Sequence, residues 1–120
     1  MNDLTMGVAE SRFADIIWEN EPISSSELVK RSNDLLQWKK STAFTVLKRL
    51  CNKGIFQNQN GVVSSLITRD EFYSAQSEQF VEETFNGSLP AFLAAFTSRK
   101  KLSDKEVEEI SKLIDEHKEG

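Results

Sequence analysis

Residues 38–53, WKKSTAFTVLKRLCNK, decide how the rest of the chain is interpreted. They include five cations and no acid, within a chain of 120 residues whose formal net charge is -4. Apolar side chains recur in this stretch at i, i+3, i+4 and i+7, which predicts one buried face of an α-helix. These side chains are Ala43, Val46, Leu47 and Leu50. A basic helix in an acidic chain is typical of a surface that binds a polyanion.

The polar face of this predicted helix suits the base-pair edges of a DNA major groove. There, arginine reads guanine and threonine contacts the thymine methyl group, whereas lysines bind phosphates and position the protein without reading sequence. The candidates for base contacts are Thr42, Thr45, Arg49 and Asn52, and the candidates for phosphate contacts are Lys39, Lys40, Lys48 and Lys53. Ser41 is a further candidate for a DNA contact. Taken alone, the stretch leaves open an ordinary surface helix with a solvated polar face.

Two helices are predicted before this stretch. Helical apolar periodicity covers residues 8–20, and Pro22 prevents that helix from continuing. Ser24 and Glu27 have the spacing of a capping box, which predicts a second helix over about residues 25–32. Two helices joined by a short connection to a basic third helix indicate a helix-turn-helix.

A hairpin is predicted directly after the basic helix. Ser41 is the expected N-cap of that helix, which runs to about Asn52 and stops at Gly54. Asn60-Gly61 then lies between two β-prone runs, which is a strong hairpin signal. Three helices followed by a hairpin form a winged helix. Asn60 is a further candidate for a DNA contact, although a plain surface turn is the simpler interpretation of this neutral tip.

Three further amphipathic helices are predicted in the C-terminal part. One covers about residues 70–85, and the other two begin at Ser88 and Ser103. Their apolar faces exceed what a small winged helix needs for its core, so we expect a second copy of the chain to bury them. Packing on the chain's own winged helix is the alternative. The candidate dimerisation residues are Phe80, Phe85, Leu89, Phe92, Leu93, Phe96, Val107, Ile110, Leu113 and Ile114.

The acidic residues lie outside the basic helix. Residues 1–37 carry three cations and seven acids, and residues 54–120 carry seven cations and twelve acids. Uniform acidity would argue against nucleic acid as a partner. Here the acidic remainder can keep a small basic surface from binding every polyanion alike.

The composition argues against several other classes of protein. Cys51 is the only cysteine and His117 the only histidine, so an internal disulfide is impossible and a His/Cys metal site is poorly supported. Cys51 is most simply a small buried hydrophobe. No pair of acid/base residues or activated nucleophile stands out, so we expect no enzymatic activity, metal or cofactor. The absence of a long apolar run and of a signal peptide predicts no membrane insertion and a cytoplasmic location.

Several short residue groups, taken in order, carry a resemblance to a known family. They are Ala9-Glu10 with Ile16-Ile17-Trp18, Ile23-Ser24 with Glu27-Leu28-Val29, Trp38 with Thr42, Thr45, Leu47, Arg49-Leu50 and Lys53-Gly54, and Phe85-Asn86-Gly87-Ser88-Leu89 with Phe96, Leu102-Ser103 and Glu106. The chain resembles the penicillinase-repressor (BlaI/MecI) family of winged-helix transcription regulators over nearly its whole length. The resemblance implies that Thr42, Thr45 and Arg49 read DNA and that the C-terminal helices form an intertwined homodimer.

We therefore expect a mainly α protein with a winged-helix DNA-binding domain over residues 1–69 and a helical dimerisation region over residues 70–120. Its expected function is that of a homodimeric, sequence-specific transcriptional repressor that recognises an inverted-repeat operator in double-stranded DNA. A winged-helix protein-interaction module without DNA binding is the alternative.

The resemblance also implies how the repressor could be released from its operator. An upstream membrane sensor or protease would be a further partner, because family members of the antibiotic-sensing branch are cleaved at an Asn-Phe bond. This chain has Ala95-Phe96 at the corresponding place, and it lacks the cysteine tail of the copper-responsive branch.

Overall fold

The computed structural model describes residues 6–119, which form six helices and three short strands. In chain order the elements are α1 (Val8–Asn20), β1 (Ile23–Ser24), α2 (Ser25–Leu36), α3 (Lys40–Asn52), β2 (Phe56–Gln59), β3 (Val62–Ser65), α4 (Arg69–Phe85), α5 (Leu89–Arg99) and α6 (Asp104–His117). The prediction of a mainly α protein with a small hairpin is therefore confirmed. The chain forms two compact units, the first ending at Glu78 and the second beginning at Gln79. The division into two functional regions at residues 69 and 70 stays a prediction.

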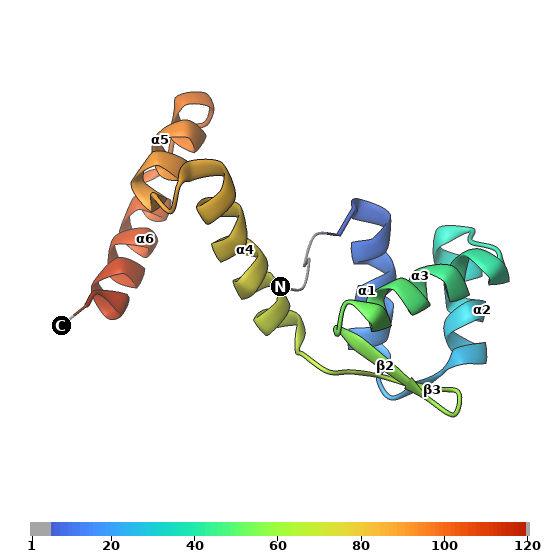
Figure 1. Ribbon diagram of the computed structural model, residues 1–120. Coiled ribbons are helices and arrows are strands. Elements are labelled where there is room, and N and C mark those ends of the chain that lie inside the picture. Colours follow the sequence, from blue (N-terminus) through green and yellow to red (C-terminus); the bar gives the residue numbers. More distant parts are fainter. Residues whose placement is uncertain (1–5, 120) are drawn as a thin grey trace. The chain divides into compact units, whose positions relative to one another are not determined.

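The first unit is a winged helix. Figure 1 shows α1, α2 and α3 grouped together, with the β2–β3 hairpin extending from one end of the group. The three strands form an antiparallel sheet in the order β1-β3-β2. The sequence predicted the hairpin but not β1, in which Ile23 pairs with Val63 and Ser24 pairs with Val62.

A single apolar core closes the first unit. Its fully buried aromatic side chains are Phe13, Phe56 and Phe72, and Phe72 comes from the first turn of α4. Trp18 packs against this core and donates a hydrogen bond from its Nε1 to the Ile67 carbonyl oxygen at 3.1 Å. The start of α4 is therefore part of the winged-helix core.

Local sequence signals set most helix starts, and two predicted helix boundaries were wrong. The Ser24 side chain caps α2, accepting a hydrogen bond from the Glu27 amide at 3.1 Å. However, α2 continues past Ser32 to Leu36 and ends at Gln37, whose left-handed backbone forms the C-cap. Ser32 is tolerated inside the helix because its buried hydroxyl donates to the Leu28 carbonyl oxygen. The N-cap of α3 is Lys39 rather than Ser41 and makes no side-chain cap. Ser41 instead lies in the first turn.

The hairpin turn has the geometry that Asn-Gly predicted. Asn60 and Gly61 have φ angles of 56° and 84°, and the flanking residues Gln59 and Val62 are paired. Positive φ at both central residues is what a two-residue type I′ turn requires. The Asn58 side chain holds the turn further, since its Oδ1 accepts a hydrogen bond from the Gly61 amide at 3.0 Å.

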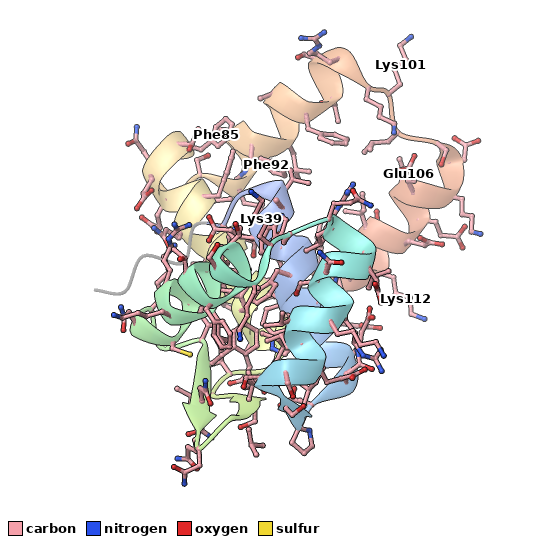
Figure 2. The ribbon with its side chains drawn as sticks, turned by 90° about the vertical axis from the view of Figure 1, so that its right-hand side faces the viewer. Lys39, Phe85, Phe92, Lys101, Glu106 and Lys112 are labelled. Atoms are coloured by element: carbon pink, nitrogen blue, oxygen red, sulfur yellow. The ribbon has the colours of Figure 1, made fainter. Side chains whose placement is uncertain are left out.

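The second unit consists of the end of α4 together with α5 and α6. The Ser88 side chain caps α5, and Ser103 and Glu106 form the reciprocal capping box expected at the start of α6. Figure 2 shows Glu106 at this start. None of the described residues 79–119 is fully buried, so this unit has no closed core within one chain. Among the residues described, no helix combines the length and apolarity required to cross a membrane.

Candidate nucleic-acid interface

The two faces of α3 are separated as the periodicity predicted. The four apolar residues of the predicted stripe are all buried in the core. Nine of the ten residues predicted to contact DNA are exposed, namely Lys39, Lys40, Ser41, Thr42, Thr45, Lys48, Arg49, Asn52 and Asn60, whereas Lys53 is half-buried. The polar face of α3 is therefore free to meet a partner.

A shallow hollow lies on this exposed face of α3. Its volume is about 230 Å³, and it is lined by Ser41, Thr42, Thr45, Val46 and Arg49. The Thr45 hydroxyl donates to the Ser41 carbonyl oxygen at 2.9 Å. Because its proton is used within the helix, Thr45 offers a base edge its methyl group and an acceptor oxygen. A methyl group at this position suits contact with thymine.

Arg49 has a partner that the local sequence did not predict. Its Nη1 lies 3.3 Å from Oε1 of Glu10, which is a residue of α1. The Arg49 side chain is 50% exposed and the Glu10 side chain 22% exposed. An acidic side chain therefore lies directly beside the predicted reading face. No spacing rule connects two residues that are 39 positions apart.

Two of the five cations of the basic stretch lie at the N-terminus of α3. Lys39 and Lys40 occupy the cap and the first helical position, and the first turn contains no acid. Figure 2 shows Lys39 at this end of the helix. The unpaired amide groups of a helix N-terminus also favour anions, so both features suit a phosphate.

Two aromatic residues of the basic stretch have different environments. Trp38 stacks on Phe13, with ring centroids 5.2 Å apart, and packs against the apolar core. Phe44 is exposed on α3, and the Lys40 ammonium lies 6.0 Å from its ring centroid. Phe44 is thus available for a contact to a partner.

Cys51 is half-buried rather than fully buried as the sequence suggested. Burial raises the pKa of the Cys51 thiol above its ordinary value of 9.0, so the thiol is protonated at neutral pH and unsuited to metal binding or nucleophilic attack. Within residues 6–119, no group of three or more His, Cys, Asp or Glu side chains could hold a metal ion.

The predicted dimerisation residues are only partly covered within one chain. Phe85 lies 5.7 Å from Phe92 between ring centroids, and Phe80 lies 6.2 Å from Phe92; Figure 2 shows Phe85 and Phe92 close to each other. Six of the ten are exposed, namely Phe80, Leu89, Phe96, Val107, Leu113 and Ile114, and the other four are half-buried. These exposed apolar side chains are available for contact with a partner.

The three-helix core, the hairpin and the exposed basic helix define a winged helix-turn-helix protein. The family model described as penicillinase repressor matches residues 6–116, and the chain belongs to this family. Its members are transcriptional repressors and not enzymes.

Curated relatives cover most of the chain. A penicillinase repressor from Bacillus licheniformis is 26% identical over 114 residues, which is 92% of this chain and 89% of that protein. The methicillin resistance regulatory protein MecI from Staphylococcus aureus is 24% identical over 110 residues, or 88% of this chain and 89% of that protein. A penicillinase repressor from Staphylococcus aureus is 23% identical over 115 residues, covering 92% and 91% respectively.

Proposed function

We propose that this protein is a homodimeric repressor whose α3 helices read an inverted-repeat operator in double-stranded DNA. The observation that carries the proposal is the exposed face of α3, where hydroxyl, amide and guanidinium groups lie beside lysines while the apolar stripe is buried. The names of the relatives, penicillinase repressor and MecI, support gene regulation as its role. The protein would bind this operator DNA in the cytoplasm.

The proposal gives the side chains of α3 two kinds of role. Arg49 and the hydroxyl-bearing residues contact base edges, with the Thr45 methyl group on thymine. The lysines bind phosphates and fix the position of the helix in the groove. Asn60, at the tip of the wing, contacts the backbone or minor groove beside the same half-site.

A second copy of the chain is the proposed partner of the second unit. Residues 79–119 contain no fully buried side chain, yet apolar residues run along both α5 and α6. A two-fold pair of chains covers these faces and also presents two copies of α3, as an inverted repeat requires. Release by an upstream sensor or protease is a further part of the proposal, but cleavage between Ala95 and Phe96 is not, because this bond lacks the asparagine of the antibiotic-sensing branch.

Selection of binding sites from random duplex DNA, followed by a salt titration, tests the proposal. We expect an inverted repeat and an affinity that falls steeply with salt, because phosphate contacts release counterions. Arg49→Ala should lose about 1–3 kcal/mol at one base pair, whereas Lys40→Ala should weaken all duplexes alike and reduce the salt slope by about one. If no duplex is selected and salt-insensitive binding to another protein is found instead, the protein-interaction alternative holds.

A further inference from the structure

The contact between α1 and the reading helix joins two charged side chains at the edge of the predicted DNA-binding face. Nη1 of Arg49 donates to Oε1 of Glu10 at 3.3 Å. The second carboxylate oxygen, Oε2, is buried and has no hydrogen-bond partner. Glu10 therefore directs one oxygen at the guanidinium while its other oxygen is withdrawn from water, an arrangement unlike that of a freely solvated acid.

We propose that Glu10 is a positioning residue that sets the sequence discrimination of Arg49. This inference rests on the proposed function, because it requires Arg49 to contact a base. It adds a residue of α1, outside the helix-turn-helix pair, to those that determine specificity.

The first reason is the order that the contact gives to Arg49. A free arginine side chain loses considerable rotamer entropy when it is fixed on a base. The contact with Glu10 uses Nη1, which leaves the edge formed by Nε and Nη2 for a bidentate contact to guanine. A guanidinium that is already held in place loses less conformational entropy when it binds. This lower cost strengthens binding only where the base opposite Arg49 is guanine.

The second reason is charge. The Glu10 carboxylate lies beside a surface that meets phosphates, so it repels duplex DNA of any sequence. The contact between Arg49 and guanine offsets this repulsion only at the correct site. A negative charge at this place therefore weakens binding to random DNA more than binding to the operator, which raises the ratio of the two affinities.

A purely structural link between α1 and α3 is the competing explanation, and a matched variant separates the two. Asp15 also lies on α1 and accepts a hydrogen bond from an exposed arginine, Arg69, at 3.0 Å. The side-chain exposures are similar, 54% for Arg69 and 32% for Asp15. Asp15→Asn and Glu10→Gln therefore remove the same charge and the same kind of ion pair from one helix, but the arginine paired with Glu10 belongs to α3, whereas the arginine paired with Asp15 belongs to α4.

The DNA-binding test compares the full-length variants on the selected operator and on a random duplex. We expect Glu10→Gln to bind the random duplex roughly two- to fivefold more tightly, the size of one exposed charge interaction, and to lower the operator-to-random ratio. Asp15→Asn should leave this ratio unchanged. In an Arg49→Gln background, Glu10→Gln should no longer alter preference for the guanine pair. An equal ratio for wild type and Glu10→Gln overturns the inference.

A second measurement needs no DNA. Nitrogen-15 relaxation of the Arg49 Nε group in the free protein should show an ordered side chain in the wild type and in Asp15→Asn, and a mobile one in Glu10→Gln. Equal order in all three proteins overturns the inference, even if operator binding is normal. A wild type that prefers no duplex overturns the proposed function and this inference together, whereas an unchanged affinity ratio with normal operator binding overturns this inference alone.

Discussion

Replacing Leu113 by alanine should weaken the proposed dimer while leaving each chain folded. Leu113 lies on α6 and is 56% exposed within one chain. Most of its side chain is therefore available to a second copy, and its loss removes little from the packing of the single chain. This makes Leu113→Ala a more selective test than a change in the half-buried Phe92, which also packs on Phe85.

The size of the effect follows from the exposed fraction. Full burial of a leucine side chain contributes about 1.5–3 kcal/mol. Roughly half of this gain, together with the cavity left by truncation, amounts to about 1.5 kcal/mol for each chain. Two-fold symmetry counts the loss twice, so the dimer should be destabilised by about 3 kcal/mol, or about a hundredfold in dissociation constant.

Analytical ultracentrifugation over a range of protein concentrations measures this constant directly. Leu66→Ala is the matched control, because Leu66 is 53% exposed but lies in the first unit. We expect Leu66→Ala to dimerise as the wild type does. A monomeric wild type, or equal weakening by the two variants, would show that α6 does not form the interface.

Three further predictions concern the stability of the fold. Trp18→Phe should destabilise the first unit by about 1–2 kcal/mol in chemical denaturation, because the Ile67 carbonyl oxygen loses its donor at 3.1 Å. Ser103→Ala should reduce the far-UV helix signal and destabilise α6 by about 1 kcal/mol through loss of its cap. Hydrogen bonds from the amide and hydroxyl of Ser103 lower the pKa of Glu106 from its ordinary value of 4.5. The stability that ionised Glu106 contributes is therefore fully present above pH 4.5 and is lost as the pH falls through the lowered pKa. An acid titration of Glu106→Gln should show a flatter stability curve than the wild type, and parallel curves would contradict this assignment.

The helices and the hairpin could be predicted because their signals are local. The buried stripe of α3 repeats at helical spacing, and Asn60-Gly61 can adopt the positive φ angles that its turn needs. Caps at Ser24 and Ser103 act within three residues of the helix start. In each case the residues that determine the structure are neighbours in the chain, so the sequence alone contains the relevant interaction.

The features that were missed depend on contacts between distant residues. β1 has only two residues and exists because β3 pairs with it. Glu21 lies just before β1 and accepts hydrogen bonds from the amide and hydroxyl of Ser65, which is 44 residues away. The contact between Glu10 and Arg49 likewise depends on how α1 and α3 pack. Periodicity identifies the helix face on which a residue lies, but it does not identify the side chain of another element that contacts it.

The positions of the fluorescent side chains have a practical consequence for spectroscopy. Both tryptophans and the only tyrosine, Trp18, Trp38 and Tyr73, belong to the first unit. Intrinsic fluorescence therefore reports the unfolding of the winged helix and does not report the unfolding of α5 and α6. Trp38 stacks on Phe13 and immediately precedes Lys39, the N-cap of α3. Its emission therefore provides a label-free optical probe at the N-terminal end of the helix that we propose enters the major groove.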